Sequence, residues 1–315
     1  MFLTIPIDHG NRDMKTLNHV FPSSYVESST LAVAGDATLK CDGVEYTLND
    51  MRLPQLNDKT VNDRYFILTL FAIGKELADT PRLQRPLASD ELVHIELLIG
   101  LPLQHFRELK MKFIAYFADR GEINFTFNKR DYSIVISDIH AYPQGYAAYI
   151  ASRSQLMNSK AVSIIDIGGY TVDCLSIIDN KPILESCRSL EIGVNTLFQT
   201  INDRVRAKAK KPIPEKIIEC ILKRDSAALI ERRNQVDLIV TSARIHVSNL
   251  ISELSQYFDL EEDSTIFVGG GSILLKQQIL DAGAVKKPSF INNVHANAQG
   301  YLKIRDMEKR LRRVS

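Results

Sequence analysis

Two aspartates, Asp8 and Asp166, each end a short apolar run, and each is followed two residues later by a glycine, Gly10 or Gly168. Glycine has no Cβ, so its backbone can approach a ligand closely, and successive N–H groups in a turn form a concave site for an anion. A carboxylate repels phosphate, but it can hold a hydrated Mg²⁺ or orient a water molecule. The two segments therefore predict phosphate-binding turns in which Asp8 and Asp166 hold Mg²⁺ through water.

The residues after each aspartate would supply the contacts to phosphate. Lys15 lies on the returning strand if the first turn is a hairpin, and its ammonium group would balance phosphate charge. One Asp-x-Gly segment is typical of an ordinary turn, but two copies about half the chain apart favour phosphate binding and two similar half-domains. The candidate nucleotide-binding residues of these turns are Asp8, Gly10, Asn11 and Lys15, and then Gly168, Gly169, Tyr170 and Thr171.

A third segment consists of Gly269, Gly270, Gly271 and Ser272, after an apolar run and before a helical pattern. A strand, several glycines and a helix N-terminus commonly bring backbone against a nucleotide. The spacing is neither the GxGxxG fingerprint nor a Walker A loop. We expect these four residues to pack against the nucleoside, and the alternative is a tight strand-to-helix connection.

Gln144 stands between a predicted strand and a predicted helix, in the segment Tyr-Pro-Gln-Gly. Glutamine is not a strong base, but it can orient an attacking water, as the glutamine of GTPases does. The alternative is an incidental polar residue at a helix start. The seven histidines form no HxxH or HExxH pattern, and no GxSxG segment occurs, so neither a histidine metal cluster nor an α/β-hydrolase is supported.

Composition excludes several classes. The chain has 315 residues with 39 Lys+Arg against 38 Asp+Glu, which argues against a dedicated nucleic-acid surface. Its four cysteines are scattered without a CxxC pair, as expected for free thiols in a reducing compartment. No apolar run approaches the roughly 20 residues of a membrane span, and the N-terminus lacks the pattern of a signal peptide. We expect a cytoplasmic protein without a membrane anchor, whose basic C-terminal run is a solvated last helix or a partner-binding tail.

The elements that position these residues follow an α/β pattern. Buried strands are predicted at 2–7, 92–99, 134–136, 161–165 and 265–268. Helical patterns cover 62–77, 106–117, 145–154, 195–205, 242–258 and the segment after Ser272. Mixed strands and helices of this kind favour an α/β architecture.

Taken in order, the motifs resemble those of the actin-like ATPase superfamily, and most closely the bacterial plasmid-segregation actins of the ParM type. Asp8 and Asp166 begin segments similar to its two phosphate motifs, and Gly269 begins a segment similar to its adenosine motif. Gln144 falls at the first connecting helix, and Asn297-Ala-Gln-Gly falls at the second. The matches run through nearly the whole chain.

Three departures from the family pattern are visible. Tyr170 stands where a small residue is usual. Asn11, Arg12 and Asp13 replace the run of small Ser, Thr and Gly residues in the first turn. Gln144 replaces the acidic residue of some ParM-type members and is more actin-like. These departures bear on hydrolysis rather than on the nucleotide site itself.

The resemblance implies a two-lobed actin-like α/β fold, each lobe a mixed sheet with helices, and a nucleotide cleft between the lobes. Lobe I would be 1–160 with 295–315 and a smaller insertion at about 31–89. Lobe II would be 161–294 with a helical insertion at about 205–255.

The resemblance also implies a function. The protein would bind ATP or GTP with Mg²⁺, with Gln144 and Asp166 as the catalytic residues, and would hydrolyse it while assembling into filaments. Those filaments would segregate plasmid DNA through a DNA-binding adaptor on a centromere-like site, with no direct nucleic-acid binding. Two alternatives are a small-molecule kinase of the sugar-kinase type and a membrane-associated actin-like scaffold.

Overall fold

The computed structural model describes residues 1–27, 37–51, 53–81, 92–155, 159–209 and 211–314. The chain folds into two compact units. Unit 1 is Met1–Ala151 with His295–Ser315, and unit 2 is Ser152–Val294. Parts of the predicted insertion, 31–36, 52 and 82–89, lie outside the described residues.

Unit 1 is built on a nine-stranded sheet in the order β3-β2-β1-β7-β9-β8-β5-β6-β4. Strands β1, β7 and β9 run parallel to one another, and every other pairing in this sheet is antiparallel. In chain order the strands are β1 (Phe2–His9), β2 (Asp13–Lys15), β3 (Val20–Pro22), β4 (Tyr25–Glu27), β5 (Thr38–Cys41), β6 (Val44–Leu48), β7 (Leu92–Leu101), β8 (Glu122–Phe127) and β9 (Arg130–Pro143). The two edge strands, β3 and β4, are joined by only Ser23 and Ser24, so the sheet curls back on itself.

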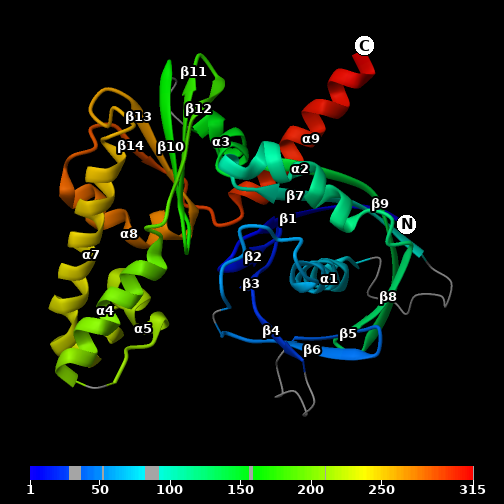
Figure 1. Cartoon of the computed structure of the whole chain (residues 1–315), viewed down its shortest axis with the longest axis horizontal. Helices are drawn as coiled ribbons and strands as arrows, with labels where there is room; N and C mark the ends of the chain where they lie inside the picture. Colours follow the sequence, from blue (N-terminus) through cyan, green and yellow to red (C-terminus); the bar gives the residue numbers. More distant parts are fainter. Residues whose placement is uncertain (28–36, 52, 82–91, 156–158, 210, 315) are drawn as a thin grey trace. The chain divides into compact units, whose positions relative to one another are not determined.

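Helix α1 (Arg64–Asp79) lies inside this curled sheet, with strands on several sides of it (Figure 1). Ten consecutive residues, from Tyr65 to Gly74, are buried. A helix buried on every face must be enclosed, and a curled sheet encloses it. The packing is close, because a Cβ on Gly74 would lie 2.6 Å from Cγ of Phe127. The helix predicted at 62–77 is thus confirmed, with its ends shifted by two residues.

In the described part of unit 1, three helices accompany α1. Helix α2 (Leu103–Phe117) packs on β7 and β9, and helix α9 (Ala296–Val314) packs on β1 and β7. Helix α3 (Tyr146–Ser152) follows β9, and a Cβ on Gly300 of α9 would lie 2.0 Å from the Ala147 carbonyl oxygen of α3. Helices α3 and α9 therefore meet backbone to backbone.

The strand predicted at 134–136 is much longer than expected. Strand β9 runs from Arg130 to Pro143, and only its middle forms a continuous apolar run. Its flanks mix exposed and buried residues; the first half pairs with β8 and the second half with β7. Apolar patterning alone therefore finds only the centre of the strand.

Unit 2 has a five-stranded sheet in the order β12-β11-β10-β13-β14. Its strands are β10 (Ala161–Ile167), β11 (Val172–Ile178), β12 (Lys181–Leu190), β13 (Ser264–Val268) and β14 (Pro288–Phe290). The helices are α4 (Val194–Ala209), α5 (Glu215–Leu222), α6 (Ser226–Glu231), α7 (Arg233–Leu254) and α8 (Gly269–Ala282). Strands β10, β13 and β14 are parallel, so the carboxyl ends of β10 and β13 meet at one edge.

The helix predicted at 242–258 is wrong at both ends. Helix α7 begins at Arg233 and ends at Leu254. Its first turns carry mostly exposed polar residues, with Ile239 as the first buried position, so the apolar period is visible only further along. Phe258 is buried but lies beyond the helix, in the turn that leads to β13.

The expectation of free thiols is confirmed, since the four cysteines form no disulfide and Cys41 and Cys174 are buried. Within the described ranges, no helix combines the length and the apolar character needed to cross a bilayer.

Candidate functional site

The first Asp-x-Gly segment of unit 1 forms a hairpin, which is the condition under which the sequence places Lys15 on the returning strand. Strands β1 and β2 pair antiparallel with Asp8 opposite Lys15, and the Lys15 Nζ lies 3.4 Å from the Asp8 Oδ2. Gly10 donates its N–H to the Asp8 carbonyl at 3.1 Å. A Cβ on Gly10 would lie 2.4 Å from the Asp13 carbonyl oxygen, so the turn requires glycine here.

Asp8 is a buried carboxylate surrounded by hydrogen-bond donors. Its side chain receives the Gln144 Nε2–H at 2.6 Å and the Tyr301 hydroxyl at 3.3 Å, both on Oδ1. The Asn297 Nδ2–H reaches Oδ2 at 3.4 Å. Asp8 itself is only 2% exposed. The structure therefore gathers residues from the first strand, the end of β9 and the last helix around one carboxylate.

Asp8 stays ionised in this position. Burial by itself would raise the pKa of Asp8. The ammonium groups of Lys15 and Lys59 and the hydrogen bonds from Asn297 and Gln144 outweigh burial and hold that pKa below its ordinary value of 3.8. The site thus presents a fixed negative charge at neutral pH.

Two amide side chains in unit 1 are oriented by their neighbours. Because Gln144 donates its NH₂ group to Asp8, its Oε1 is the part that can accept a hydrogen bond from water. Asn11 is held the other way round, since its Oδ1 accepts from the Tyr65 hydroxyl at 2.7 Å and from the Leu56 N–H at 3.4 Å. The NH₂ group of Asn11 is therefore the part that can donate to an anion.

Lys59, Tyr301 and Asn297 are site residues that the sequence did not single out as ligands. Lys59 is 3% exposed, and its ammonium group donates to the His9 carbonyl. Lys59 lies in the turn before α1, where no motif in the sequence indicates a ligand. Asn297 lies in the segment that resembles the second connecting helix of the family. Spacing along the sequence does not reveal that Asn297 and Tyr301 contact Asp8.

His9, inside the first turn, is a structural residue. Its ring is buried, with Nδ1 donating to the Ile7 carbonyl at 3.0 Å and Nε2 2.9 Å from the Thr69 hydroxyl. Burial, helped by Lys59, lowers the pKa of His9 to about 3, so the ring is neutral. It ties β1 to the enclosed helix α1.

The second Asp-x-Gly segment, in unit 2, is held by the start of helix α4. The carbonyl oxygens of this turn accept backbone N–H groups, Gly168 from Val194 at 3.1 Å and Gly169 from Asn195 at 2.8 Å. Tyr170 likewise accepts from Gly193 at 3.0 Å. Because these carbonyls face α4, the opposite, amide side of the turn is the one that can meet an anion.

Gly193 is a further residue that the sequence did not predict. A Cβ on Gly193 would lie 2.5 Å from the Gly169 carbonyl oxygen and 2.5 Å from the Tyr170 carbonyl carbon. Thr171 closes the turn, since its carbonyl accepts the Gly168 N–H at 2.9 Å. Tight backbone contact between two segments therefore shapes this turn.

Asp166 and the glycines at 269–271 lie at the same edge of the unit 2 sheet. Asp166 pairs with Val268 across parallel strands, and Gly269 follows directly at φ +87°. A Cβ on Gly269 would lie 2.3 Å from the Asp166 Oδ1, whereas a Cβ on Gly270 would meet nothing within 4 Å. Helix α8 begins at Gly269, so its N-terminus adjoins the Asp166 carboxylate.

Gly271 and Ser272 face the interior. A Cβ on Gly271 would lie 2.5 Å from Cγ2 of Ile167. Ser272 is fully buried, and its hydroxyl donates to the Gly269 carbonyl at 2.8 Å. These two residues fix the position of the helix start against β10.

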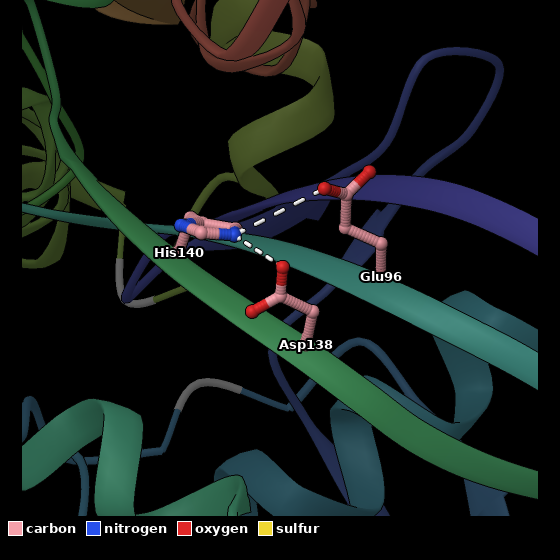
Figure 2. A group of neighbouring side chains, drawn as sticks. All are labelled: Glu96, Asp138 and His140. Carbon is pink, nitrogen blue, oxygen red and sulfur yellow. Dashed lines mark hydrogen bonds and ion pairs between the residues drawn. The ribbon is translucent and has the colours of Figure 1, made fainter. Parts of the chain in front are cut away.

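A separate charged group lies in unit 1, on β7 and β9. Glu96, Asp138 and His140 have side-chain atoms within 4.8 Å of one another, and Figure 2 shows one imidazole nitrogen directed toward both carboxylates. Arg305 donates to Glu96 at 2.7 Å and to Asp138 at 3.0 Å, and Lys309 donates to Glu96 at 2.7 Å. Both Glu96 oxygens already face cations, so the group forms an ion-pair network rather than a metal site.

Comparison with known proteins agrees with this architecture. A family model described as "Actin like proteins N terminal domain" matches residues 6–146, and one described as "Archaeal actin homologue MreB-like, C-terminal" matches residues 164–281. Together they cover most of the chain. No curated protein matches it.

Solved structures extend the likeness to the full length. The crystal structure of Ta0583, an archaeal actin homologue, has a TM-score of 0.76 at 20% identity, over 98% of this chain and 99% of that chain. A 15-stranded ParM filament from Clostridium botulinum gives 0.69 at 19% identity, over 96% and 99% of the two chains. The Alp12 filament gives 0.67 at 17% identity, over 98% and 99%.

The fold is therefore the two-lobed actin-like α/β fold, each unit a mixed sheet with helices. Family models of actin-like proteins thus match two successive parts of the chain, and the chain resembles the plasmid-segregation actins.

Acid should weaken the Glu96 network. Burial alone would raise the pKa of Glu96, but hydrogen bonds from Lys309, Thr4 and Arg305 lower it from 4.5 to about 2. A lowered pKa adds stability that is complete above pH 4.5 and is lost as the pH falls toward 2. Glu96→Gln should cost about 3–5 kcal/mol at pH 7, because buried Arg305 keeps Asp138 but loses its nearest carboxylate, and Lys309 loses its ion pair.

Urea unfolding of wild type and Glu96→Gln at pH 7, 4.5 and 3 checks this expectation. The difference in free energy of unfolding should shrink as the pH falls, because protonated Glu96 is as uncharged as glutamine. Glu122→Gln, at an exposed position on β8, is the control and should show little difference at any pH. If the difference in free energy of unfolding between wild type and Glu96→Gln does not change with pH, the lowered pKa of Glu96 is contradicted.

Proposed function

We propose that this protein binds ATP or GTP with Mg²⁺, hydrolyses the nucleotide and assembles into filaments under its control. The observation that carries the proposal is the Asp8 group: a buried, ionised carboxylate held by Gln144, Asn297 and Lys15. Proteins with the actin-like fold usually bind and hydrolyse ATP, and a structure of Ta0583 in complex with ADP has a TM-score of 0.69 to this chain. A carboxylate and a lysine beside a glycine turn suit bound phosphate and its cation.

The phosphates would be bound mainly by backbone. The amide side of the 168–171 turn, the NH₂ group of Asn11 and the ammonium group of Lys15 supply donors for the β- and γ-phosphates. Asp8 and Asp166 would hold Mg²⁺ through water, and the partial exposure of the Asp166 side chain suits a hydrated ion. The ion would neutralise phosphate charge during transfer.

Hydrolysis requires a positioned water more than covalent chemistry. Gln144 accepts a hydrogen bond from that water through Oε1, because Asp8 fixes its other end. Asp166, at the other turn, assists in orienting it. Gly269 and Gly270 lie against the nucleoside, with Gly270 as the open position, whereas Gly271 and Ser272, which the sequence also predicts there, are buried and position the helix start instead.

We further propose that the filaments segregate plasmid DNA in the cytoplasm. The support is the likeness to ParM and Alp12, whose structures are described as filaments. A DNA-binding adaptor on a centromere-like site would link the filament to its cargo, and the chain itself would not bind DNA. The lobe boundaries given above, 1–160 with 295–315 and 161–294, remain a prediction.

Light scattering of the purified chain with Mg²⁺ and ATP, and then GTP, tests the function when phosphate release is followed in parallel. Scattering should rise on nucleotide addition and decay as phosphate appears, because the triphosphate state favours the lattice. Phosphate release without scattering would favour a small-molecule kinase instead. Scattering that does not depend on nucleotide would refute the coupling between nucleotide state and filament assembly.

Gln144→Ala should lower kcat by about 10²–10³, in the range of losing one oriented group at a phosphoryl centre, and leave nucleotide affinity within a few fold. Single-turnover phosphate release and equilibrium binding of a fluorescent nucleotide separate the two effects. Gln299→Ala, at an exposed position on α9, is the matched control and should behave as wild type. Equal kcat in both variants would remove Gln144 from the mechanism.

Two neighbouring glycines give a sharper test of the second turn. Gly269→Ala should displace the Asp166 carboxylate, since φ is +87° and the new Cβ would lie 2.3 Å from Oδ1. Gly270→Ala adds the same methyl group in open space. Mg²⁺-dependent nucleotide affinity should fall at least tenfold in the first variant and hardly change in the second. If nucleotide affinity changes only slightly and equally in both variants, Asp166 is not part of the nucleotide site.

A further inference from the structure

Helix α9 carries four polar residues on one face at intervals of four: Asn297, Tyr301, Arg305 and Lys309. Residues at this spacing lie above one another along a helix. The first two contact Asp8, and the last two contact Glu96. One rigid element thus connects the candidate phosphate site with the ion-pair network of Figure 2.

At its N-terminal end, α9 joins two parts of the site. The Asn297 Oδ1 accepts the Gly145 N–H at 2.9 Å, and its Nδ2 donates to the Asp8 Oδ2 at 3.4 Å. Asn297 is 8% exposed. It therefore links the Asp8 carboxylate to the turn that carries Gln144.

Tyr301 makes a second contact between the N-terminal end of α9 and Asp8. Its side chain is fully buried, and its hydroxyl reaches the Asp8 Oδ1 at 3.3 Å. A Cβ on Gly100 would lie 1.8 Å from that hydroxyl, so β7 leaves a space that the tyrosine fills. A small sliding of α9 would break the contacts of both Tyr301 and Asn297 with Asp8.

The other end is fixed by charge. Glu96 is 1% exposed and accepts from Arg305, Lys309 and, at 2.5 Å, from the Thr4 hydroxyl. Thr4 and Glu96 are paired neighbours on β1 and β7. Strand β1 also carries Asp8, next to its last residue His9, so the contacts at both ends of α9 involve the same strand.

We propose that the Glu96 network is a positioning device that sets the register of α9, so that Asn297 holds Asp8 and the Gln144 turn in fixed relation. Glu96, Arg305 and Lys309 are positioning residues in this role, and none touches the reacting atoms. The catalytic consequence rests on the proposed function of Asp8 and Gln144. The positional consequence can be measured without nucleotide.

The test is hydrogen exchange of the Gly145 amide in the full chain, followed by NMR without nucleotide. Lys309→Met removes one cation from Glu96. In this variant the Gly145 amide should exchange about tenfold faster than in the wild type, as expected for a weakened buried hydrogen bond. Lys309→Arg should restore slow exchange. Lys112→Met removes a different ion pair of unit 1, with Asp58 at 2.5 Å, and should leave Gly145 unchanged.

Asn297→Ala provides the reference, because it deletes the acceptor of the Gly145 N–H directly. If Asn297→Ala speeds exchange and Lys309→Met does not, the network does not position α9 and the inference fails. If Lys112→Met speeds exchange as much as Lys309→Met, the effect is general loosening and the inference also fails. Because these readings need no nucleotide, they separate the inference from the proposed function.

Turnover completes the experiment. With nucleotide, Lys309→Met should lower kcat several-fold and leave KM nearly unchanged, because the oriented water is affected more than phosphate binding. Lys309→Arg should recover kcat. Faster Gly145 exchange in a chain that binds no nucleotide would support the positioning role and refute the proposed function. A change in KM alone would refute the link between the network and Gln144.

Discussion

The ionised carboxylate of Asp8, buried at the end of β1, is the constraint on which the rest of unit 1 depends. A charge removed from water costs several kcal/mol unless it is paired and hydrogen-bonded. Here the compensating groups come from four separate segments: Lys15 on the next strand, Lys59 before α1, Gln144 after β9, and Asn297 with Tyr301 on the last helix. The hairpin, the central parallel strands and α9 must all be in place before this charge is satisfied.

The enclosed helix α1 also helps to orient the first turn. A helix buried over ten consecutive residues needs a surface around it, and the curled sheet with β3 and β4 at its edges provides one. In return α1 places Tyr65 on Asn11 and Thr69 on His9, so the first turn is oriented by the core itself. Stability and site geometry share the same contacts.

Unit 2 builds its part of the site mainly from backbone. Glycines 193 and 269 allow main chain to approach main chain or carboxylate at distances that no side chain would permit. The Gly168 and Gly169 carbonyls accept N–H groups from the start of α4, and the Gly168 N–H donates to the Thr171 carbonyl, so backbone contacts within unit 2 hold this turn in shape.

The sequence by itself determined the local features. Apolar runs that end in Asp-x-Gly predicted β1, β10 and their turns, and the structure then paired Lys15 with Asp8 across the first hairpin. The start of α7 and the ends of β9 escaped it, because partly exposed flanks carry no apolar period. Tertiary structure alone decided that Lys59, Tyr301 and Gly193 join the sites, and that Arg305 and Lys309 pair with Glu96 rather than face solvent. Those contacts join residues far apart in the chain, and only packing between segments, not the pattern within one, can bring them together.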